Sequence, residues 1–119
     1  MTAGATPTNR VKTSRWLEPT VLSGDRLLVG DLTLDLPGRT ITGRGQFDRE
    51  LTHNEFVVLA SLIKDAGRVV ARQDLLESMG APAELAVVDM YVKYLRGLLL
   101  DVHSGVTIER SGNGYFLRP

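Results

Sequence analysis

The chain of 119 residues has no cysteine and only two histidines, His53 and His103. The absence of cysteine excludes disulfide frameworks, cysteine zinc sites and thiol catalysis, and it favours a reducing cytoplasm as the setting. One Asp-x-His pair, Asp101 with His103, is too little for a metal site. We therefore expect no metal and no cofactor.

Long apolar runs are also missing. No run approaches the ~20 residues that a membrane helix needs, and residues 1–15 lack the apolar core of a secretory signal. We expect no membrane partner. The sequence also shows no catalytic triad, and Gly43-Arg44-Gly45 is a turn with no helix directly after it, which excludes a phosphate-binding glycine loop. The chain is therefore not expected to be an enzyme.

An excess of charge of either sign is absent too, since 14 basic and 14 acidic residues give a net charge of zero. This balance disfavours a strong non-specific polyanion binder. The hydrophobic fraction of 43% suffices for one modest core, so we expect one domain over residues 21–119. Residues 1–20 are predicted to be a flexible tail, because small polar residues cannot offset the entropy of ordering.

Short β-like segments follow. Leu32, Leu34 and Leu36 alternate with polar residues, which is the period of a half-buried strand. Strands so close in sequence favour antiparallel pairing, because a parallel pair needs a long crossover. The pattern predicts a four-stranded antiparallel sheet from segments 26–29, 32–36, 40–42 and 46–51.

Three helices are predicted after the sheet. Thr52 and Glu55 form a capping box that starts the first, for which Gly67 is the expected C-cap. The second spans about 72–79, and the third spans about 84–100. One buried face of the third helix is indicated by the spacing of its apolar residues, Val88, Val92, Leu95 and Leu99.

The chain ends as a predicted hairpin, with strands 106–110 and 115–117 and a turn in which Asn113-Gly114 is the strongest signal. Two short helices, a longer one and a hairpin make a winged helix-turn-helix. The predicted fold class is therefore α+β, with the four-stranded sheet first, the three helices next and the wing at about 106–118.

At this point the sequence resembles a known family. The segment 51–56 (LTHNEF) resembles the L-T-x-x-E-F that opens the first helix of OmpR/PhoB-type effector domains, and 67–76 resembles G-x-V-x-S-R-x-x-L-L. The segment 88–96 is similar to V-D-V-H-I-x-R-L-R, and 112–115 to G-x-G-Y of the wing. The resemblance covers about residues 26–118.

The resemblance implies a sequence-specific, double-stranded DNA-binding transcription regulator of two-component systems. Its third helix would enter the major groove and its wing the minor groove. A second copy on tandem half-sites and RNA polymerase are further implied partners. Most members have an N-terminal receiver domain, for which 119 residues leave no room, so we expect either a stand-alone regulator or an excised C-terminal domain.

Candidate DNA contacts follow from the family positions and from the outward side of the third helix. Arg72, Lys93 and Arg110 would position phosphates, whereas Met90, Val87 and Tyr94 could touch bases. The full predicted set is Arg72, Val87, Met90, Tyr91, Lys93, Tyr94, Arg96, Arg110, Ser111 and Asn113. Asp89 is expected to be structural and to orient Arg96 or Lys93, while Tyr115 and Phe116 are expected in the core.

A second hypothesis rests on departures from the family pattern. The usual Arg-Thr before the third helix is Ala86-Val87, the Arg before Leu95 is Tyr94, and the wing Arg is Ser111. The apolar Val87/Met90/Tyr94 face could instead bind another protein, which would make the domain a protein-interaction module.

Overall fold

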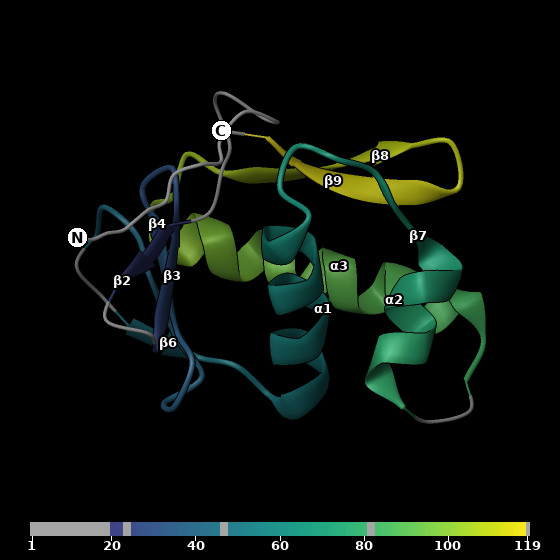
Figure 1. Ribbon diagram of the computed structural model, residues 1–119, viewed down its shortest axis with the longest axis horizontal. Helices are drawn as coiled ribbons and strands as arrows, with labels where there is room; N and C mark the ends of the chain where they lie inside the picture. The colour runs from purple at the N-terminus through teal and green to yellow at the C-terminus, as the bar shows by residue number, and fades with distance from the viewer. Residues whose placement is uncertain (1–19, 23–24, 46–47, 81–82, 119) are drawn as a thin grey trace, which may run out of the picture.

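The N-terminal part of the chain forms an antiparallel sheet in the computed structural model, which describes residues 20–22, 25–45, 48–80 and 83–118 (Figure 1). The strands lie in the order of the chain, β2-β3-β4-β5-β6, and each pairs with the next. They span Thr20–Leu22 (β2), Arg26–Val29 (β3), Leu32–Asp35 (β4), Thr40–Thr42 (β5) and Asp48–Glu50 (β6).

The four predicted strands are therefore confirmed, and β2 is a fifth that the sequence pattern did not predict. The tail predicted for residues 1–20 lies outside the described residues up to residue 19, and Thr20 already belongs to β2. The alternation in β4 is confirmed, because Leu32 and Leu34 are fully buried while Thr33 between them is not.

The helices follow, and α1 (His53–Lys64) begins as predicted. The Thr52 hydroxyl accepts a hydrogen bond from the Glu55 amide at 3.4 Å, and the Glu55 carboxylate accepts one from the Thr52 amide at 2.8 Å. The predicted C-cap at Gly67 is wrong. The helix ends at Lys64 with Asp65 as its C-cap, and Gly67, at φ +86°, turns the chain two residues later.

Helices α2 (Arg72–Met79) and α3 (Leu85–Asp101) match their predicted spans to within one residue. The apolar stripe of α3 is confirmed, because Val88, Val92 and Leu95 are completely buried and Leu99 nearly so. Helices α1 and α2 both pack against α3, which makes α3 the central rod of the domain (Figure 1).

The C-terminal end of α3 is fixed by a Schellman motif. The His103 amide donates to the Leu100 carbonyl at 3.0 Å, and the Ser104 amide donates to the Leu99 carbonyl at 2.9 Å, with His103 in the left-handed region at φ 58°. The Gly45 amide donates to the Val102 carbonyl at 3.0 Å, so the loop before β6 anchors the N-terminal sheet on this end of α3.

The wing is part of a three-stranded sheet in the order β7-β9-β8, with β7 at Val70–Ala71, β8 at Thr107–Ser111 and β9 at Gly114–Arg118. Its turn is Gly112-Asn113 and not Asn113-Gly114, because Ser111 pairs with Gly114. A positive φ at Gly112 alone is the type II′ pattern. Gly114 must be glycine, because a Cβ there would collide with the Val70 carbonyl oxygen of β7.

Within the described residues, no helix is long and apolar enough to cross a membrane. The acidic and histidine side chains of these same residues form no group of three or more that could hold a metal ion.

Candidate nucleic-acid interface

The side of α3 that faces away from the core is open. Ala86, Lys93 and Gly97 are exposed there, and so are the larger side chains of Met90 and Tyr94, at 39% and 50%. The wing turn lies at the same end of the molecule as α2 and the first turns of α3 (Figure 1). Together these elements form one surface with a rod, a supporting helix and a projecting ribbon.

The first predicted contact, Arg72, is held by an ion pair. Its Nε donates to Asp89 Oδ1 at 3.0 Å and its Nη2 to Asp89 Oδ2 at 2.7 Å, and only 19% of its side chain is exposed. The Tyr115 hydroxyl donates to the same carboxylate at 2.6 Å. The expectation that Asp89 orients Arg96 or Lys93 is therefore wrong. Asp89 instead joins α2, α3 and the wing strand β9.

The electrostatics of this cluster favour the ionised carboxylate. Burial on its own raises the pKa of Asp89, but the Tyr115 hydrogen bond and the Arg72 hydrogen bonds and charge outweigh it and lower the pKa below its usual value. Burial and the neighbouring Asp89 raise the pKa of Tyr115, which therefore stays a hydrogen-bond donor. Tyr115 is buried, as predicted, and Phe116 is half-buried.

The two remaining arginines of the predicted set flank the same tyrosine. Arg96 lies with its guanidinium carbon 5.7 Å from the centre of the Tyr115 ring, and its Nε donates to the Ile108 carbonyl at 3.0 Å. Arg110 lies at the same distance from the ring and is exposed, with Nε 3.4 Å from the Gly112 carbonyl oxygen. Arg96 is exposed as well, and its hydrogen bond holds β8 on α3, whereas Arg110 presents its cation on the wing.

The wing turn is tied to the start of α2. The Arg72 amide donates to the Asn113 carbonyl at 2.9 Å, while the side chains of Ser111 and Asn113 remain exposed. This hydrogen bond fixes the position of the wing turn relative to α2 and α3.

The opposite edge of the surface is formed by Tyr91 and Val87, which are both half-buried against the core. The Tyr91 hydroxyl accepts from the Asn54 amide nitrogen at 3.2 Å, and its ring meets that of Tyr94 edge-on, with 6.1 Å between centres and 87° between planes. Asn54 was not singled out from the sequence, and nothing in its position inside the capping box indicated this bond.

Placed together, α2, α3 and the β8–β9 ribbon define a winged helix-turn-helix domain. Residues 46–117 match the protein family described as "Transcriptional regulatory protein, C terminal". The chain belongs to this family of OmpR/PhoB-type response regulator effector domains, which regulate transcription and are not enzymes.

The chain is similar to the transcriptional regulatory protein PrrA of Mycobacterium leprae, at 36% identity over 101 residues that cover 81% of this chain and 42% of PrrA. It thus spans less than half the length of that relative. The crystal structure of DrrB, a Thermotoga maritima OmpR/PhoB homolog, is 32% identical with a TM-score of 0.66, over 80% of this chain and 45% of DrrB. The RstA DNA-binding domain of Klebsiella pneumoniae, solved in complex with the RstA box, is 25% identical with a TM-score of 0.65, over 79% of this chain and 97% of that domain.

Proposed function

We propose that this domain binds duplex DNA sequence-specifically as a transcription regulator, with α3 in the major groove and the wing on the adjacent minor groove. The single observation that supports this most is the uncovered outer face of α3 beside an exposed wing turn. The major groove of B-DNA admits one α-helix, and winged helices dock in this way. The likeness to RstA, whose structure contains its DNA box, supports the same docking.

The predicted residues have different roles in DNA binding. Lys93 and Arg110 have exposed cationic heads and contact phosphates. Met90 and Tyr94 meet base edges, the first through thymine methyl groups and the second through its hydroxyl. The remaining proposed contacts with DNA are made by Val87, Tyr91, Ser111 and Asn113.

In this proposal Arg72 and Arg96 mainly hold the elements of the surface in place, because each side chain is already bonded within the domain. In the described part of the chain, the surface made by α2, α3 and the wing has few cations without a partner inside the domain, so affinity for phosphates is modest and falls only gently with salt. A second copy on a tandem half-site strengthens binding through effective concentration. RNA polymerase is the further proposed partner. The proposal places the domain in the cytoplasm, where bacterial chromosomal DNA lies.

Titration of isotope-labelled protein with a random duplex pool and with a selected duplex tests the proposal. We expect amide shifts at residues 86–97 and at the wing turn. These shifts should be larger with the selected duplex than with the random pool. As a matched control, Arg26→Ala alters a cation on the N-terminal sheet and leaves these shifts unchanged. Absence of shifts in α3 and the wing at low salt would overturn the proposal.

A second candidate function is protein binding through the Val87/Met90/Tyr94 face. The specific observation in its favour is that Met90 and Tyr94 are large, apolar and exposed, while two arginines of the family pattern bond inside the domain. The same titration separates the two functions. Protein binding alone predicts that duplex DNA leaves the α3 amides unmoved.

A further inference from the structure

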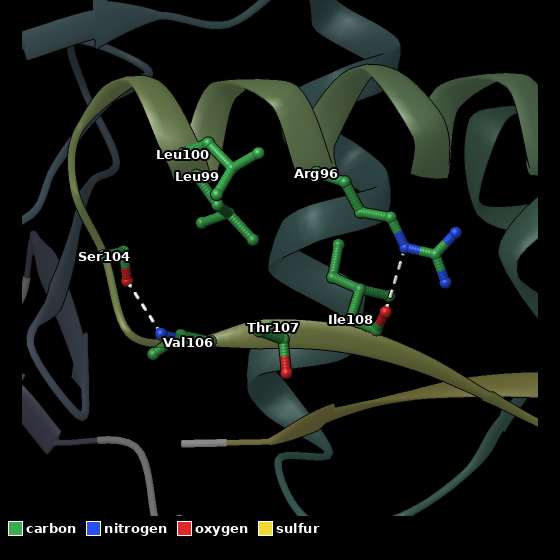
Figure 2. Close-up of a pocket in the computed structure, with 7 residues that line it drawn as sticks. All are labelled: Arg96, Leu99, Leu100, Ser104, Val106, Thr107 and Ile108. Carbon is green, nitrogen blue, oxygen red and sulfur yellow. Dashed lines mark hydrogen bonds between the residues drawn. The ribbon is translucent and has the colours of Figure 1, made fainter.

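An apolar groove lies between the C-terminal half of α3 and strand β8 (Figure 2). Leu99 and Leu100 belong to its helical wall, and Val106 and Ile108 to the opposite wall. The cavity has a volume of about 250 Å³. This is smaller than the roughly 300–1,000 Å³ of typical small-molecule sites, so it suits one large side chain better than a separate ligand.

The groove differs in place and chemistry from the proposed DNA surface. The hydrogen bond from Arg96 to the Ile108 carbonyl bridges its two walls (Figure 2). At the other end, Leu100 is 75% exposed, the highest value among the large hydrophobic residues described. An exposed leucine alone is ordinary, but this one borders a cavity that an apolar group would fill.

The path of the chain into β2 points to the occupant. Thr20 pairs with Leu28 of β3, so the Thr20 end of β2 points toward the Gly30-Asp31 turn. That turn touches the groove. A Cβ on Gly30 would lie 3.1 Å from Val106, and Asp31 accepts hydrogen bonds from the Ser104 hydroxyl at 2.7 Å and the Gly105 amide at 2.9 Å.

Four residues before Thr20 the sequence has Trp16, the only tryptophan of the chain, followed by Leu17. Both lie outside the described residues. Four residues can reach at most about 14 Å, which exceeds the roughly 7 Å that two residues span along a strand from Leu28, the partner of Thr20, to Gly30 at the turn. A tryptophan buries some 150–250 Å² of surface, so its docking in an apolar groove would remove a large area from water.

We propose that Trp16, with Leu17 beside it, docks into the groove between α3 and β8 of its own chain. Charge supports this orientation. The groove ends at the last turn of α3, where the helix dipole is negative. The residue before Trp16 is Arg15, a cation of complementary sign. The docked segment ties the chain before β2 to the same helix whose outer face forms the proposed DNA surface.

Fluorescence of the full chain tests the docking, because Trp16 is the sole tryptophan. Expected are a blue-shifted emission and a severalfold lower acrylamide quenching constant than in the urea-unfolded chain, both independent of protein concentration. Leu100→Glu is expected to shift emission and quenching to the unfolded values. Its matched control, Leu85→Glu, makes the same change at an exposed leucine at the other end of α3 and leaves both unchanged.

Circular dichroism verifies that each variant is folded. As an independent measurement, Trp16→Ala is expected to move the amide signals of residues 99–108 and to leave those of residues 86–94 in place. The proposal is overturned by unfolded-like emission of the parent, by protection that Leu100→Glu does not change, or by protection that appears only as concentration rises. The last result would assign the groove to a second copy.

Discussion

Arg72 at the start of α2 and Asp89 in the first half of α3 face each other in a two-pronged ion pair, with Nε–Oδ1 at 3.0 Å and Nη2–Oδ2 at 2.7 Å. The Tyr115 hydroxyl completes the carboxylate's partners at 2.6 Å. A single side chain thus sets the positions of α2 and the wing relative to α3. Removal of Asp89 is expected to loosen both.

Asp89→Ala is expected to lower the free energy of unfolding by about 1–3 kcal/mol, because it leaves a largely buried guanidinium and a buried hydroxyl without their acceptor. Urea unfolding measures the change. Asp101→Ala is the matched control, since its pair with Arg49 is 3.7 Å long and exposed on both sides. Such pairs are worth about 0–1 kcal/mol. Equal losses in the two variants would contradict the assigned role of Asp89.

The stability of the domain is expected to fall in acid through Asp31. Burial raises the pKa of this carboxyl, but hydrogen bonds from Ser104 and Gly105 and the charge of Arg44 outweigh burial and lower it. A pKa that is lower in the folded state contributes stability above the unfolded value of about 3.9. That stability is lost as pH falls below about 4 toward the folded pKa.

Urea unfolding of parent and Asp31→Asn from pH 7 to pH 3 measures this contribution. The variant is expected to be less stable at pH 7 and to lose less on acidification. Parallel curves would show that Asp31 does not link the N-terminal sheet to the loop after α3 through its charge.

Lys93→Ala and Arg110→Ala are each expected to flatten the slope of log affinity against log salt for duplex DNA by about one unit, because each removes one phosphate contact. Fluorescence anisotropy with a labelled duplex measures the slope. Arg26→Ala, on the N-terminal sheet, keeps the parent slope. If both test variants also keep it, these phosphate contacts are assigned wrongly.

His103→Gly is expected to stabilise the domain by about 0.5–1 kcal/mol, because a left-handed backbone strains every residue with a Cβ while glycine adopts it freely. The φ of His103 is 58°, and thermal unfolding measures the gain. The reverse change, Gly80→Ala, meets no atom within 4 Å at φ 74°. It should therefore cost about 1 kcal/mol from strain alone. A loss in His103→Gly would mean that its ring packing outweighs its backbone strain.

The helices could be predicted from the sequence because their signals are local. The Thr52–Glu55 capping box spans four residues, and the stripe of α3 is a periodicity within one segment. The predicted C-cap at Gly67 was wrong because a local signal does not fix the exact residue at which a helix ends. Gly67 is the only glycine near the end of α1, yet the helix ends at Lys64 and its C-cap is Asp65, two residues before the glycine.

The candidate site was predictable in its position but less so in its pairings. The outward residues of α3 follow from helical geometry, so Met90, Lys93 and Tyr94 were placed correctly on the exposed face. The partner of Asp89 did not follow, since Arg72 lies 17 residues away on another helix. Only the packing of α2 against α3 brings the two groups together.

The sequence by itself determined the order of the four predicted strands, the three helices and the hairpin, the buried face of α3 and the membership of the family, because each depends on periodicity, capping or local motifs. The tertiary structure alone decided the partners of the arginines, since a guanidinium bonds whatever acceptor the fold places within its reach. It also decided the wing turn. Both Gly112-Asn113 and Asn113-Gly114 suit a two-residue loop, and the close approach of Val70 to Gly114 fixes the first.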